Sequence, residues 1–201
     1  NETHGFGTVF LDIFVKQVNA DRSGRLQLAH ENVNVAGPWD VFQEQDTSLP
    51  GARKDIADIV LTNGTTAFVV ENYYQSDGHD HSYDNYLRYG KELVVDDEGL
   101  ASGSSIVVML CQYRDDELLS KSGWRQAAVV TYESLISALT LEIERLPQYQ
   151  AKNPDAYTFI KQVESFFIGG KGMVAPEQSQ SFVKALCKTG AGHEFSAGSP
   201  D

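Results

Sequence analysis

Residues 56–73 read IADIVLTNGTTAFVVENY, and this stretch decides the fold. It holds two apolar runs, Ile56–Thr62 and 66–71, which are separated by Asn63-Gly64. An Asn-Gly pair between two such runs is a strong hairpin signal, because both residues accept the positive φ angles of a tight turn. We therefore expect two adjacent antiparallel strands here.

Patterns on either side of this hairpin predict the rest of an α/β domain. Apolar residues spaced three and four apart predict helices at 9–18, 83–93, 132–146, Pro154–Phe167 and 181–187. Apolar and polar residues alternate at 39–45, which predicts a strand there. Continuous apolar runs predict strands covered on both faces at 106–111 and 127–131. We expect one mixed central sheet flanked by helices, in a single domain over residues 1–201 with a helical part from about 132 and a loose tail from about 190.

Net charge, the length of the apolar runs and the cysteine count limit the classes of protein to which this chain can belong. The 201 residues carry a net charge of −12, whereas proteins that bind nucleic acid without sequence preference usually present a basic surface. The apolar runs are too short to cross a bilayer, and residues 1–7 lack the plan of a secretory signal, so we expect a cytoplasmic protein without a membrane partner. The two cysteines, Cys111 and Cys187, are expected to be reduced core thiols.

Two acids define the candidate site. Asp58 lies within the first hairpin strand and Glu71 ends the second. Pairing of the strands brings the end of one beside the start of the other, so the two carboxylates can converge on one divalent cation. Carboxylate oxygens are the ligands that hard cations such as Mg²⁺ and Mn²⁺ prefer.

These residues also carry a family resemblance. The run Ile-Ala-Asp58-Ile-Val-Leu, followed by Phe-Val-Val-Glu71-Asn72-Tyr73, resembles the PD-(D/E)XK nuclease superfamily, in the group that reads R-x-D-I and later I-E-N-K. Asn85-Tyr86-Leu87-Arg88-Tyr89 resembles the Gln-Leu…Arg-Tyr helix of that group, and His4-Gly5-Phe6-Gly7 its helix entry. Glu44 occupies the place where many members carry an acid on the first strand.

The resemblance implies a restriction-endonuclease-like fold and hydrolysis of nucleic acid, with DNA favoured over RNA, in the presence of Mg²⁺ or Mn²⁺. It implies that Asp58, Glu71, Glu44 and the carbonyl of Asn72 hold the cation. It further places Tyr73, Asn85 and Tyr89 among the catalytic residues, and Arg88 and Lys91 as contacts to the substrate phosphate. A further acid-bearing helix is expected upstream of residue 1.

Tyr73 departs from the pattern, because the family has a lysine two residues after the glutamate. A neutral phenol supplies a hydrogen bond but no fixed positive charge. Asn85 stands where the helix glutamine is expected, and its side chain is one methylene shorter. Lys91 and Lys54 are candidates for a relocated lysine.

Two other interpretations fit the sequence. The first is a catalytically inactive nuclease-fold module that binds or scaffolds, with a protein partner or as a homo-oligomer. The second is a metal site in the loop that contains Asp77, His79, Asp80 and His81, since His-x-His spacing suits a transition metal. We interpret that loop as solvated, because the sequence offers no third ligand for it.

Overall fold

The computed structural model describes residues 7–26, 33, 37–73, 81–95, 99, 103–121 and 123–168. The predicted helix at 181–187, the tail from 190, and His4, Asp77, His79 and Asp80 lie outside these ranges. No helix within the described ranges is long and apolar enough to cross a lipid bilayer. The elements run α1 (Val9–Gly24), β1 (Asp40–Asp46), β2 (Ile56–Thr62), β3 (Thr66–Tyr73), α2 (Tyr83–Glu92), β4 (Ser104–Cys111), α3 (Asp116–Ser120), the 3₁₀ turn η1 (Trp124–Gln126), β5 (Ala128–Thr131), α4 (Tyr132–Arg145), α5 (Tyr149–Lys152) and α6 (Pro154–Phe167).

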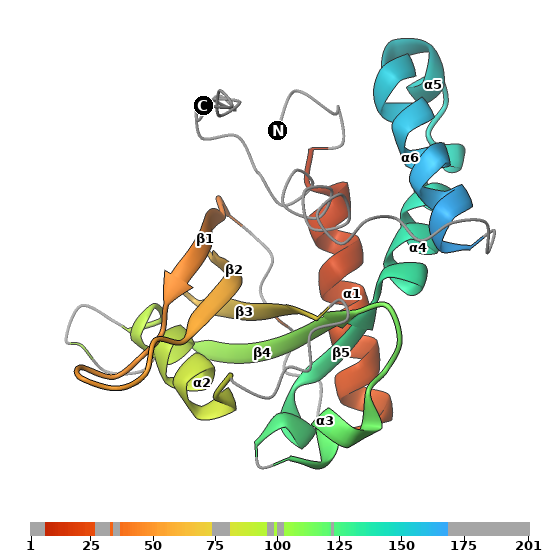
Figure 1. The fold of residues 1–201 in the computed structure, drawn as a ribbon. Helices are drawn as coiled ribbons and strands as arrows, with labels where there is room; N and C mark the ends of the chain where they lie inside the picture. The colour runs from red at the N-terminus through yellow and green to blue at the C-terminus, as the bar shows by residue number, and fades with distance from the viewer. Residues whose placement is uncertain are drawn as a thin grey trace, which may run out of the picture.

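The five strands form one mixed sheet, as predicted, and their order in it is β1-β2-β3-β4-β5 (Figure 1). The first three strands are antiparallel, and β4 and β5 run parallel to β3. The predicted hairpin turn is present: Gly64 has φ 80°, and the Asn63 side chain accepts the backbone N–H groups of Thr65 and Thr66. α2 lies on the connection from β3 to β4, and such a crossover is what a parallel pair requires.

One face of the sheet packs against α1 and α4, and α6 packs on the outside of α4. Phe68 is fully buried in this layer, where its ring stacks on Trp39 at 5.7 Å between centroids and meets the edge of Phe14 at 5.5 Å. The helices contribute their apolar stripes, including Val18 from α1 and Leu139 from α4. This is the larger core of the domain, and it fixes the sheet on which the site is built.

The opposite face packs against α2, α3 and η1, around Tyr86, Trp124 and Met109. Gly90 permits a close approach of α2, since a Cβ there would lie 2.2 Å from the Ser105 Oγ on β4. The Ser105 hydroxyl also donates to the Leu87 carbonyl at 3.1 Å. α2 is therefore held tightly on β3 and β4, and its first turn is carried to the end of the hairpin.

Several boundaries differ from the predicted ones because of tertiary contacts. α1 continues through Gly24, six residues beyond the predicted end, and there the Asp21 carboxylate accepts the Val129 N–H at 2.9 Å while Arg25 pairs with Asp21. β3 continues to Tyr73, because it stays paired with β4 as far as Cys111. The short helices α3 and α5 have too few residues to show a periodic pattern.

Cys111 is expected to resist alkylation while the protein is folded. Its side chain is fully buried at the end of β4, and burial raises the pKa of the thiol to about 12. Relative to its ordinary value, this lowers the thiolate population at pH 8 by roughly 1,000-fold. We expect a Cys187→Ser chain, which keeps Cys111 as its single thiol, to react with iodoacetamide in urea and to remain unmodified without it, as measured by mass spectrometry. Fast labelling of the folded chain would contradict the buried placement.

Candidate functional site

Asp58 and Glu71 lie next to each other on the hairpin strands. The β2–β3 register pairs Ile59 with Val70, so Asp58 and Glu71 occupy the next opposed positions, on the same face of the sheet. The Asp58 carboxylate accepts the backbone N–H of Asn72 at 2.8 Å. The hairpin thus brings the two acids together as the sequence predicts.

The Glu71 carboxyl lies in an environment that opposes its ionisation. The side chain is buried, and burial together with the charge of Asp58 raises the pKa of the carboxyl to about 7. The Tyr86 hydroxyl lies 2.6 Å from the Glu71 carboxyl and 2.7 Å from the Ile56 carbonyl. Burial in turn raises the pKa of Tyr86, so this phenol stays protonated and can donate a hydrogen bond to one of these oxygens.

His81 belongs to the site, which corrects its interpretation as a solvated loop residue. Its Nδ1 lies 2.9 Å from the Asp55 carboxylate, and its Nε2 lies 3.7 Å from a Glu71 oxygen. Burial lowers the pKa of the imidazole, but the charges of Glu71 and Asp55 outweigh burial, so the net shift raises it. The indole N–H of Trp124 holds the backbone, donating to the His81 carbonyl at 3.2 Å.

Asp55 orients this region, and nothing in the sequence pattern singled it out. The side chain is buried and accepts the backbone N–H of Ser82, the N-cap of α2, at 3.1 Å. It also accepts the side-chain amide of Asn85 at 2.9 Å. The Asn85 amide therefore acts on Asp55, which in turn holds His81.

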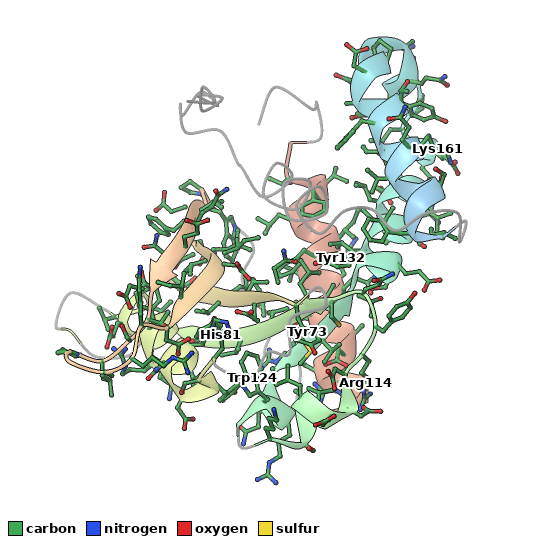
Figure 2. The ribbon with its side chains drawn as sticks, viewed as in Figure 1. Tyr73, His81, Arg114, Trp124, Tyr132 and Lys161 are labelled. Carbon is green, nitrogen blue, oxygen red and sulfur yellow. The ribbon has the colours of Figure 1, made fainter. Side chains whose placement is uncertain are left out.

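Tyr73 ends β3 and faces a different acid. Its hydroxyl donates to the Asp115 carboxylate at 2.7 Å. Asp115 is the N-cap of α3, and hydrogen bonds from the Leu118 N–H and from Tyr73 hold the pKa of its carboxyl below its usual range. Figure 2 shows Tyr73 near the ends of the strands, in the same region of the view as His81 and Trp124.

The Asn72 side chain is anchored on the other side of the sheet, where the Tyr132 hydroxyl donates to its Oδ1. Tyr132 is the first residue of α4 and is fully buried. The backbone of Asn72 bonds to Asp58 at the same time. α4 therefore fixes the main chain that follows Glu71.

Removing this anchor is expected to loosen the site. Tyr132→Phe deletes the hydroxyl and leaves the Asn72 Oδ1 buried without that donor, which costs about 1–2 kcal/mol of unfolding free energy. Urea denaturation followed by circular dichroism measures this loss. Tyr157→Phe, on the partly buried surface of α6, is the matched control, and equal effects of the two changes would contradict the anchoring role.

Glu44 lies across from Asp58 on the edge strand. The β1–β2 register pairs Gln43 with Ile59 and Gln45 with Ala57, which leaves Glu44 opposite Asp58. Glu44 has φ 53°, in the left-handed region that residues with a Cβ rarely adopt, and its side chain is exposed. The structure thus brings Glu44 to the edge of the site.

The remaining predicted contacts lie further along α2. Arg88 pairs with Glu92 and donates to the Thr47 carbonyl at 2.6 Å, and the Tyr89 hydroxyl donates to Gln45 at 3.1 Å. Lys91 is exposed in the last turn of the helix, whereas the first turn faces Asp55. Lys54 is also exposed.

The donor set fits a hard cation in its chemistry, although within the described part of the chain no three His, Cys, Asp or Glu side chains are already gathered as a metal site. Asp58 and Glu71 supply carboxylate oxygens, and the main-chain carbonyl of Asn72 is the third oxygen that the resemblance implies. Mg²⁺ and Mn²⁺ commonly combine one or two carboxylates with water and backbone oxygens. A cation would also offset the like charges of the two acids.

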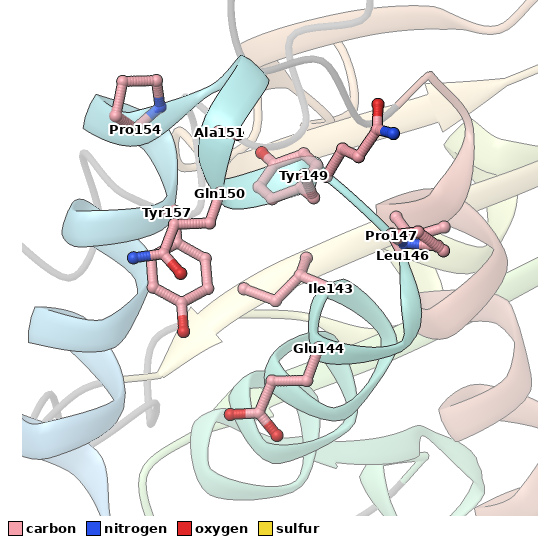
Figure 3. A pocket seen from close by; sticks show the side chains of 10 residues that line it. Ile143, Glu144, Leu146, Pro147, Tyr149, Gln150, Ala151, Pro154 and Tyr157 are labelled. Atoms are coloured by element: carbon pink, nitrogen blue, oxygen red, sulfur yellow. The ribbon is translucent and has the colours of Figure 1, made fainter.

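A groove of about 610 Å³ lies elsewhere, between α4, α5 and α6 (Figure 3). Ile143, Leu146, Tyr149 and Tyr157 line it, with Glu144 at its rim. Figure 1 shows these helices on the opposite side of the molecule from α2. The groove lacks the paired acids, so the hairpin end is the better candidate for chemistry.

The site therefore consists of the paired acids Asp58 and Glu71, with His81 and Tyr86 beside Glu71 and Asp55 behind His81. Tertiary packing brings Tyr86 and Asp55 to the site. In the sequence, Tyr86 looks like any other apolar residue of a helix. Comparison of the chain with models of known protein families, with curated proteins and with solved structures finds no match.

Proposed function

We propose that the chain hydrolyses phosphodiester bonds of nucleic acid with the help of a divalent cation held by Asp58 and Glu71. The observation that supports this most is the buried Glu71 carboxyl beside Asp58, with its pKa raised to about 7. Two acids held together in this way destabilise the fold, and such costs are typical of functional sites. A cation bound between them would remove the repulsion.

The chain's own residues would hold and orient this site. Asp58 is fixed by the Asn72 N–H, and the Tyr86 hydroxyl fixes one oxygen of Glu71. Mg²⁺ or Mn²⁺, when bound, neutralises charge on a phosphodiester and lowers the pKa of a water molecule. Glu44, opposite Asp58 on β1, would accept a hydrogen bond from water.

A second candidate function is a catalytically inactive module of the same fold that binds or scaffolds a protein partner. One contact favours it: the Tyr73 hydroxyl is bonded to Asp115, where an active nuclease of the resembled family would present an ammonium group. The net charge of −12 also opposes tight, non-specific contact with nucleic acid.

The test is a cleavage assay of the purified chain with plasmid, single-stranded DNA and RNA in Mg²⁺ or Mn²⁺. We expect metal-dependent cleavage of DNA in preference to RNA, and its loss in Asp58→Asn/Glu71→Gln. Glu133→Gln/Asp155→Asn removes the same charges from exposed positions on α4 and α6, and it should cleave as the unmodified chain does. Absence of cleavage at high protein concentration would reject the enzyme and leave the inactive module.

A further inference from the structure

The two ring nitrogens of His81 face two different acids. Nδ1 lies 2.9 Å from the Asp55 carboxylate, while Nε2 lies 3.7 Å from the Glu71 Oε1. His81 directly precedes the N-cap of α2, and Trp124 and Ser82 hold its backbone in place. The ring is therefore held between Asp55 and the acid that would carry the cation.

The contacts of Asp55 determine which nitrogen carries the proton. Its second oxygen already accepts the Ser82 N–H at 3.1 Å and the Asn85 amide at 2.9 Å, as an ionised carboxylate does. Nδ1 is then the donor to Asp55, and the Tyr86 oxygen, 3.1 Å away, is placed to share that proton. In the neutral ring this leaves the lone pair of Nε2 directed to the side of Glu71.

The separation of Nε2 and Oε1 fits two ligands of one ion. At 3.7 Å the atoms are too far apart for a hydrogen bond. The distance is shorter than two metal–ligand bonds of about 2.1 Å each, so a single cation can reach both atoms. A histidine that binds metal through one nitrogen usually donates the other N–H to a carboxylate, which is the part that Asp55 plays here.

We propose that the Nε2 of His81 is a ligand of the same cation as Glu71, oriented by Asp55, so that the site takes Mn²⁺ or a similar transition metal in preference to Mg²⁺. This inference rests on the proposed cation site and adds a nitrogen ligand to it. Both ions bind carboxylate oxygens, but Mn²⁺, as a transition metal, also accepts an imidazole nitrogen in its shell, whereas Mg²⁺ favours an all-oxygen shell. The preference for Mn²⁺ over Mg²⁺ follows from the type of ligand, so a binding measurement can detect it without any catalytic step.

The experiment is calorimetric titration of the metal-free full chain with MnCl₂ and with MgCl₂. The unmodified chain is expected to bind Mn²⁺ at least about tenfold more tightly than Mg²⁺, since losing even a group that only orients a metal ligand commonly costs about tenfold or more in affinity. His81→Gln should lose that preference through weaker Mn²⁺ binding, and Glu71→Gln should weaken the binding of both cations. His30→Gln, the same change elsewhere in the chain, should behave as the unmodified protein does.

Electron spin echo spectroscopy of the Mn²⁺-loaded chain tests the bond directly. We expect a nitrogen coupling that changes when histidine is labelled with ¹⁵N and disappears in His81→Gln. The labelled, unmodified chain decides the question even if the variant does not fold. Binding of Mn²⁺ without nitrogen coupling, or coupling that survives in a folded His81→Gln, overturns the inference while the Asp58–Glu71 site stands. If the chain binds neither cation, both the inference and the proposed function are rejected.

Discussion

Replacing Tyr73 by lysine is expected to raise metal-dependent cleavage of DNA by about 100- to 1,000-fold. One preorganised group that stabilises developing charge commonly changes a catalytic rate by this factor. Tyr73 and Glu71 are two residues apart on β3, so their side chains share a face of the sheet. A lysine there would present a positive charge beside the proposed cation site. Initial rates on a fluorescent DNA duplex measure the gain.

The charge of Asp115 affects where a lysine side chain at position 73 would lie. Asp115 now accepts the Tyr73 hydroxyl, and its charge would also attract an ammonium group at that position. Tyr73→Lys/Asp115→Asn removes that competing charge and keeps an asparagine at the N-cap of α3, where asparagine caps as well as aspartate.

Tyr73→Met is the matched control, because it has similar length and no charge. A rise in both variants, or in neither while the chain still binds Mn²⁺, would count against a missing lysine as the cause of weak activity. Adding Glu71→Gln to the lysine variant should return cleavage to background.

Glu71→Gln is expected to stabilise the metal-free protein at pH 8 by about 2–3 kcal/mol. The pKa of Glu71 is raised from its ordinary value of 4.5 to about 7, mainly by burial and then by Asp58. Glutamine keeps a similar shape and can still bond to Tyr86, but it carries no charge to bury. Urea denaturation in EDTA at several pH values measures the difference.

The sign of the pH dependence follows from the direction of the shift. The raised pKa means that folding favours the protonated Glu71 carboxyl. The stability that the protonated carboxyl gives the fold is therefore complete below pH 4.5 and is lost as the pH rises through about 7. The advantage of Glu71→Gln should therefore be small at pH 5 and largest at pH 8. Saturating Mn²⁺ should reverse it, since only the carboxylate binds the cation strongly.

Glu133→Gln serves as the control, because Glu133 is exposed in the first turn of α4. Its effect should stay within about 0.5 kcal/mol at every pH. The difference in unfolding free energy between Glu71→Gln and the unmodified chain should change from pH 5 to pH 8. If that difference stays constant, Glu71 is not buried as an acid.

Local patterns were sufficient to predict most of the elements. The Asn63-Gly64 turn predicted the hairpin, and Pro154–Phe167 was predicted at its observed bounds. The opposition of Asp58 and Glu71 could also be predicted, because a tight turn sets the pairing of the residues that follow it.

The partners of the acids could not be predicted in this way. Asp55 reads as a loop acid and Asp115 as one of several acids before a short helix, yet they hold His81 and Tyr73. These contacts join residues 26 and 42 positions apart, and no local periodicity encodes such pairs.

By itself the sequence determined the α/β class, the hairpin and the pair of acids on it, since spacing and turn chemistry act between neighbouring residues. Only the tertiary structure decided that Glu71 is buried beside Tyr86 and His81, that Asn85 bonds to Asp55, and that Tyr73 bonds to Asp115. Those outcomes depend on the packing of α2 and η1 against one face of the sheet. Burial and the field of nearby charges, which set the pKa of Glu71, exist only once those elements are packed.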